Sequence, residues 1–127
     1  MKTVISKMIL AAAILVPGTA FAGIALAPVM QSWNHDRRQI DAMLAGDRPF
    51  DQAAVAATIH TYVTDASMVA GHVSGSSPEA RDFAARFRRF AQTAAASAKD
   101  SGSVARFRPH FEELVGECRS CHAVYNN

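Results

Sequence analysis

Apolar side chains recur at intervals of three or four residues in four separate stretches of this chain, whereas no stretch alternates as a β-strand would. Because an α-helix makes one turn about every 3.6 residues, each stretch is predicted to be a helix with one apolar face. Short connections that contain Gly, Ser or Pro separate the stretches. The predicted helices span approximately residues 28–45, 51–71, 78–99 and 103–125.

Residues at the predicted boundaries support these helices. Asp51 suits an N-cap position, and Ser77 begins a favourable start for the third helix. Pro109 is awkward inside the fourth helix, because it removes one backbone hydrogen bond and should kink or restart the helix. The fourth helix is therefore expected to start either near Ser103 or nearer Arg108.

Four amphipathic helices joined by short loops predict an all-α fold, an antiparallel up-down-up-down four-helix bundle. In this arrangement the start of the first helix and the end of the fourth helix lie at the same end of the bundle. The segment that carries the helices, residues 23–127, has the length of one domain and contains no internal repeat.

Residues 1–22 have the features of a secretory signal peptide. Two lysines precede an apolar run at residues 8–16, which is too short to span a bilayer. Cleavage is expected before Gly23, which follows an Ala-Phe-Ala triplet, although residues 25–27 offer a second site. An uncleaved membrane anchor is the alternative. We therefore expect a mature periplasmic protein with no membrane span.

Loss of the signal peptide would change the charge balance. Two lysines and no acidic residue would leave, so the 13 basic residues would fall to 11, against 11 acidic ones. The mature formal charge is then zero, and the remaining charges alternate in sign without forming a basic stripe. The sequence also contains no recognisable catalytic constellation. We expect neither a nucleic-acid-binding protein nor an enzyme.

Residues 118–122, near the C-terminus, form a C-x-x-C-H motif, which is the attachment pattern for c-type haem. The thiols of Cys118 and Cys121 can add to the two haem vinyl groups, and His122 would then ligate the iron. These are the only two cysteines of the sequence, and a disulfide between them would close too short a loop to stabilise much. We predict one covalent haem c; a non-haem helical protein with a structural C-x-x-C is an alternative.

The opposite side of the iron needs a separate argument. A thioether or an imidazole is a usual sixth ligand of haem iron. Bundle geometry favours Met30, because it begins the first helix at the end where the motif lies. Met43 lies at the far end of that helix and Met68 near the end of the second. A methionine near a helix end is also a common core filler. The histidines that could serve instead are His35, His60, His72 and His110.

Two further motifs accompany the C-x-x-C-H run. Residues 46–51 read GDRPFD. Residues 111–125 begin with Phe111 and, after four intervening residues, continue as G-E-C-R-S-C-H-A-V-Y. With these motifs the chain resembles the class II cytochromes c, which include cytochrome c′, over nearly all of the segment after the signal peptide. The family has a G-x-x-P-[FY]-D loop and a G-x-C-[KR]-x-C-H-x-x-Y ending. The resemblance implies a four-helix bundle with a C-terminal haem-attachment site.

The resemblance also bears on the sixth ligand. Counting from the loop motif, Met30 stands where this family carries its distal residue, and Val29-Met30 is similar to the Leu-Met of the low-spin members, whose Met binds iron. In cytochrome c′ proper the distal residue is often a nonligating Leu, and some five-coordinate members have Met. Two positions depart from the family pattern. Leu26 stands where an Arg near a propionate is frequent, and Asn126 where a basic residue often follows the last Tyr.

The other prominent side chains are expected to be structural. Trp33 lies one turn from Met30 and is expected in the core or in the haem wall, and Tyr125 is expected to pack on the bundle or on the haem edge. The remaining expectations are a core position for Phe83, Phe87 and Phe90, a solvated face for Arg86, Arg88 and Arg89, and a structural or exposed position for His60, His72 and His110.

Together these features predict a periplasmic monohaem cytochrome that acts in outer-sphere electron transfer, with His122 and Met30 as iron ligands. Its partners would be redox proteins of the periplasm, and a homodimer is left open. The alternative is a five-coordinate, cytochrome c′-like protein that binds NO or CO at an open distal site.

Overall fold

The computed structural model describes residues 26–125, and all regular structure in that range is helical. The expected signal peptide at residues 1–22 lies outside the described residues. The elements are α3 (Leu26–Ala45), α4 (Gln52–His72), α5 (Pro78–Ser97), a short 3₁₀ helix η2 (Ala98–Asp100) and α6 (Val104–Val124). Each predicted helix is present, with boundaries displaced by only a few residues.

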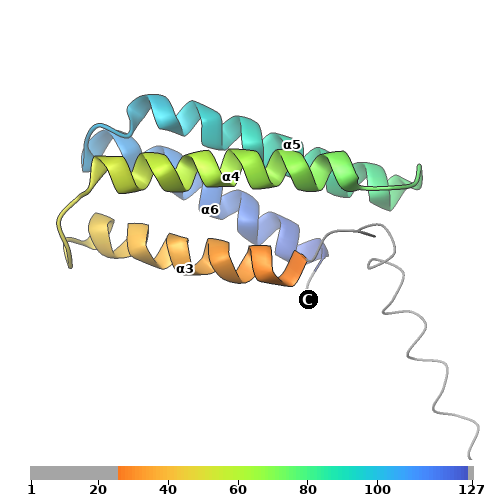
Figure 1. Ribbon diagram of the computed structural model, residues 1–127, viewed down its shortest axis with the longest axis horizontal. Helices are drawn as coiled ribbons and strands as arrows, with labels where there is room; N and C mark the ends of the chain where they lie inside the picture. Colours follow the sequence, from red (N-terminus) through yellow and green to blue (C-terminus); the bar gives the residue numbers. More distant parts are fainter. Residues whose placement is uncertain (1–25, 126–127) are drawn as a thin grey trace, which may run out of the picture.

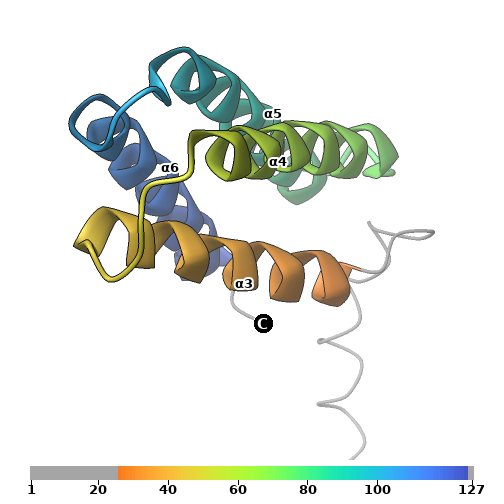
Figure 2. The ribbon, with the colours of Figure 1, turned by 60° about the vertical axis from the view of Figure 1, so that its left-hand side comes forward.

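The four long helices run in alternating directions and form an antiparallel bundle (Figure 1). The start of α3 and the end of α6 lie at the same end, as the sequence predicts. In both views α6 crosses from the end of α5 toward α3 (Figures 1 and 2), and in Figure 1 its last turn lies at the end of the bundle where α3 begins. This crossing brings the C-x-x-C-H motif to the helix that carries Met30.

Side chains cap three of the helices at the positions where the chain enters them. The Asp51 carboxylate accepts a hydrogen bond from Ala54 N at 3.0 Å, and the Ser77 hydroxyl accepts one from Ala80 N at 3.1 Å. Ser103 caps α6 in the same way, through Arg106 N. Because each cap pairs an amide that has no partner within the helix, the caps account for where the helices begin.

Pro109 does not set the start of α6, so the expectation of a start nearer Arg108 is wrong. The helix begins at Val104 and continues through Pro109. Two interactions favour the earlier start. The Ser103 side chain accepts from Arg106 N at 3.3 Å, and the buried rings of Phe107 and Phe111 flank the proline and hold both sides of it in the core. Packing therefore compensates for the hydrogen bond that proline removes.

The core runs through the middle of the bundle and is made largely of the side chains with helical periodicity. Phe107, Val55 and Ile40 are at most 1 % exposed. No helix among residues 26–125 is both long enough and apolar enough to cross a membrane. The buried members of the predicted faces are Trp33, Ile40, Leu44, Val55, Ile59, Tyr62, Ala66, Val69, Phe83, Phe87, Phe90, Ala94, Phe107, Phe111 and Leu114.

Candidate functional site

A cavity of about 330 Å³ lies where the start of α3 meets the end of α6, with α4 and α5 completing its walls. Its volume falls in the range of small-molecule and cofactor sites. Most of its lining surface is apolar, and the polar side chains that line it come from all four long helices. The bundle therefore contains a preformed site at the end where the sequence predicts one.

Both cysteines and the histidine of the C-x-x-C-H motif line this cavity: Cys118, Cys121 and His122. Both cysteines are half-buried free thiols. Burial raises the pKa of the Cys118 thiol to about 11, and burial also raises the pKa of the Cys121 thiol. Both groups are therefore protonated thiols at neutral pH, side by side on one turn of α6, in the arrangement expected for addition to two vinyl groups.

Met30 is the one methionine of the described residues that lines the cavity, and it enters from α3 opposite α6. Met43 is buried in the core near the other end of α3, and Met68 is 43 % exposed on α4. His122 is likewise the one cavity-lining histidine among residues 26–125. The structure therefore brings Met30 and His122 to one site and leaves the other candidate ligands outside it: Met43, Met68, His35, His60, His72 and His110.

An aromatic wall forms one side of the cavity. Trp33 stacks on Phe90 with 4.8 Å between ring centroids, and it packs against Tyr62 at 5.2 Å. The indole Nε1 donates to Asp65 at 2.9 Å, which fixes the orientation of the ring. Trp33 is thus both a core residue and a wall residue, as predicted. Phe87 and Phe90 lie in the core, as expected, and they also line the cavity.

Arginines from two sides of the cavity supply positive charge. Arg37 of α3 and Arg119 of α6 line it, and Arg37 has only long contacts, at 3.4 Å to Asn34 and 3.5 Å to Asp41. Leu26 stands where an arginine is frequent in the family that the sequence resembles, and its side chain is half-buried against the core. Sequence reasoning did not assign Arg37 to the site, although Arg37 lies seven residues after Met30, two turns along the same helix face.

Arg86 also lines the cavity, so the expectation of a solvated face is wrong for this residue. Its side chain is 21 % exposed, whereas Arg88 and Arg89 are exposed as expected. The physical reason is helical spacing. Arg86 lies three residues after Phe83 and four before Phe90, and this places Arg86 on the face that the buried rings define.

Glu117 is a second residue that sequence reasoning missed. Its Oε1 accepts a hydrogen bond from Thr93 Oγ1 at 2.9 Å, while its Oε2 is buried without a partner. Burial raises the pKa of this carboxyl, and the Thr93 hydrogen bond partly opposes the rise. Glu117 also lines the cavity, so this oxygen lies at the wall of the site without a hydrogen-bond donor.

The donor set fits a covalently attached haem. Two adjacent thiols match the two vinyl groups, an imidazole and a thioether are both ligands that haem iron takes, and the aromatic wall suits the flat macrocycle. Arg37 and Arg119 would offer positive charge to the two propionates.

Comparison with known proteins agrees with this geometry. The family model for cytochrome c′ matches residues 27–126. No curated protein and no solved structure matches the chain. The matched segment contains all four long helices except the first residue of α3, and it includes the complete C-x-x-C-H motif. The chain therefore belongs to the cytochrome c′ family of four-helix-bundle haem proteins, and its cofactor is haem c.

Proposed function

We propose that this protein is a periplasmic electron carrier with one haem c, bound through Cys118 and Cys121 and ligated by His122 and Met30. The observation that carries the proposal is the placement of Met30 and His122 on facing helices around one cavity. The haem would supply the ferric–ferrous couple. Its electron donor and acceptor would be redox proteins of the periplasm.

The cavity walls suit a carrier better than an enzyme. If His122 and Met30 both bind the iron, no coordination site would be left for a substrate. Trp33, Phe87 and Phe90 form an apolar wall on one side of the site. An iron held by two protein ligands would need little rearrangement when its charge changes, which favours electron transfer over chemistry at the metal.

The Met30→Ala variant tests the proposal. In the ferric wild type we expect the long-wavelength absorption band of thioether ligation and a low-spin spectrum, and in Met30→Ala we expect loss of the band and a high-spin spectrum. The ferrous variant should bind CO quickly and stoichiometrically. The ferrous wild type should not do so, because Met30 would occupy the iron. Met68→Ala is the matched control, because Met68 is an exposed methionine outside the cavity.

The competing function is binding of NO or CO at an open distal site. A wild type that takes up CO as quickly as Met30→Ala, with a high-spin ferric spectrum, would contradict the carrier proposal and favour this alternative.

A further inference from the structure

A cluster of side chains connects α5 to the turn that carries the C-x-x-C-H motif. Arg86 Nε donates to the Asp82 carboxylate at 2.8 Å, and Arg86 Nη1 donates to Ser120 Oγ at 3.2 Å. The Tyr125 hydroxyl donates to the same Asp82 oxygen at 2.7 Å. The Arg86 guanidinium also lies over the Tyr125 ring, 5.8 Å from its centroid. Contacts on several sides hold the guanidinium in one place.

The cluster presents its positive end to the cavity. Arg86 lines the cavity together with Cys121 and His122, whereas Asp82, its counterion, does not. The Arg86 side chain is 21 % exposed and the Asp82 side chain 44 %. The cation is therefore the better shielded member of the pair and lies nearer to the cofactor site, so bulk water and salt screen it less.

We propose that Arg86 is a fixed positive charge that raises the reduction potential of the haem from the His122 side, and that Asp82 moderates it. The physical reason is Coulombic: ferric haem carries one more positive charge than ferrous haem, so a nearby cation disfavours the oxidised state. Arg86 acts as a positioning and tuning residue, since its own hydrogen bonds go to Asp82 and Ser120. The inference rests on the proposed carrier function.

The test is the midpoint potential of the holoprotein in three variants. Arg86→Gln should lower the potential, because the cation is lost. Asp82→Asn should raise it, because Arg86 is then left uncompensated. Arg88→Gln is the matched control on the same helix; Arg88 is exposed, so this variant should shift the potential little, and added salt should remove the remaining shift.

Opposite shifts for Arg86→Gln and Asp82→Asn are the decisive result, since a merely structural role predicts that both variants loosen the same cluster and move the potential in the same direction. Shifts of equal sign would overturn the proposal, as would a shift for Arg86→Gln no larger than that for Arg88→Gln. The ferric spectrum of the wild type distinguishes failure of this proposal from failure of the carrier proposal. If Met30 does not bind the iron, the wild-type ferric spectrum is high-spin, whatever the variants show.

Discussion

The two halves of α6 have the same apolar periodicity but different surroundings. In the first half, Phe107, Phe111 and Leu114 are at most 2 % exposed and pack into the core. In the second half, from Val115 to Val124, no residue is buried, and Cys118 and Cys121 are half-buried at the cavity wall. One helix is thus held by protein packing at its start and borders a hollow at its end.

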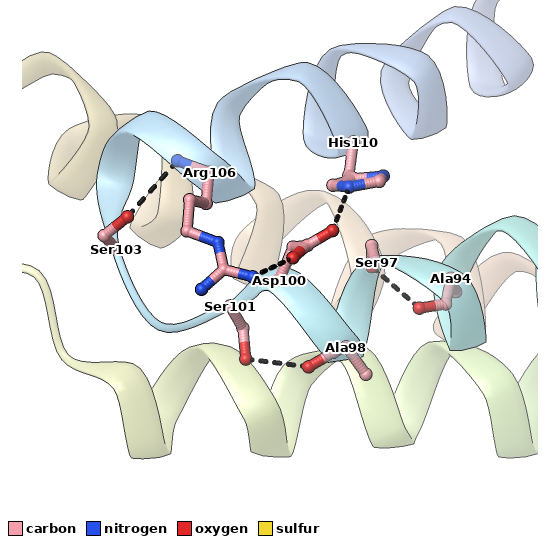
Figure 3. A network of polar contacts seen from close by, with 8 residues as sticks. All are labelled: Ala94, Ser97, Ala98, Asp100, Ser101, Ser103, Arg106 and His110. Atoms are coloured by element: carbon pink, nitrogen blue, oxygen red, sulfur yellow. Dashed lines mark hydrogen bonds and ion pairs between the residues drawn. The ribbon is translucent and has the colours of Figure 1, made fainter.

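Both ends of α6 make polar contacts, and Ser120 is bonded to Arg86 of α5 in the second half. At the start of α6, Asp100 accepts from Arg106 at 2.6 Å and pairs with His110 at 2.8 Å, and these contacts join the η2 connection to the helix (Figure 3). At the other end, the buried Oε2 of Glu117 has no partner. The comparison teaches that buried side chains hold the first half, whereas the second half, although it is bonded to α5, borders the cavity that the cofactor would fill.

The largest expected effect comes from preventing haem attachment. In the double variant Cys118→Ser/Cys121→Ser, the second half of α6 should lose most of its protection from amide hydrogen exchange, while the amides around Phe107 keep theirs. The reason is that only the second half lacks a protein core of its own. Equal loss of protection in both halves would show that the cofactor stabilises the bundle as a unit.

Truncation of a core side chain tests the first half of α6, because it should change the stability of the fold and leave the haem site unchanged. Phe107→Ala should lower the free energy of unfolding by about 3–5 kcal/mol, because it leaves a cavity in a fully packed region. The haem spectrum of the folded variant should stay unchanged. Val124→Ala, at a 58 % exposed position in the second half, is the control and should change the stability by about 0.5 kcal/mol or less. An altered spectrum in Phe107→Ala would argue against independent halves.

The smallest expected effects are those of two carboxyl groups, and they should have opposite signs. Hydrogen bonds from His110 and Arg106 lower the pKa of Asp100, whereas burial raises the pKa of Glu117. Asp100 therefore stabilises the fold above its ordinary pKa of 3.8, and this stabilisation is lost as the pH falls through the lowered value. Ionised Glu117 disfavours the fold as the pH rises above 4.5 through its raised pKa.

Thermal unfolding of the holoprotein from pH 3 to about 7 measures both effects. Asp100→Asn should be less stable than the wild type near neutral pH, and the difference should shrink in acid. Glu117→Gln should be more stable than the wild type near neutral pH, with the gain also shrinking in acid. Effects of the same sign would mean that the two ends of α6 do not differ electrostatically as their contacts indicate.

Much of the fold could be predicted because its signals are local. A helix with one apolar face appears directly as spacing in the chain, and Asp51 and Ser77 mark helix starts through hydrogen bonds that span three residues. The C-x-x-C-H motif is local as well. Met30 needed one further step, since its position opposite the motif follows from alternating helix directions once a bundle is assumed.

The residues that sequence reasoning placed wrongly or missed depend on contacts between distant segments. Arg86 lies in a run with Arg88 and Arg89, and although its spacing from Phe83 and Phe90 is a local signal, its contacts with Ser120 and Tyr125 form only when the end of the chain packs against α5. Glu117 becomes a buried carboxyl through contact with α5, at Thr93. Pro109 stays within a helix because rings on both sides of it are buried.

The sequence by itself determined the four long helices of residues 26–125, their apolar faces, the position of the C-x-x-C-H motif and the class of cofactor, because these properties depend on residue type and short-range spacing. Only the tertiary structure decided which charges face the cofactor site and which half of α6 packs into the core. Coulombic interaction and burial depend on distances through space, and residues far apart in the chain come within those distances only when the helices pack.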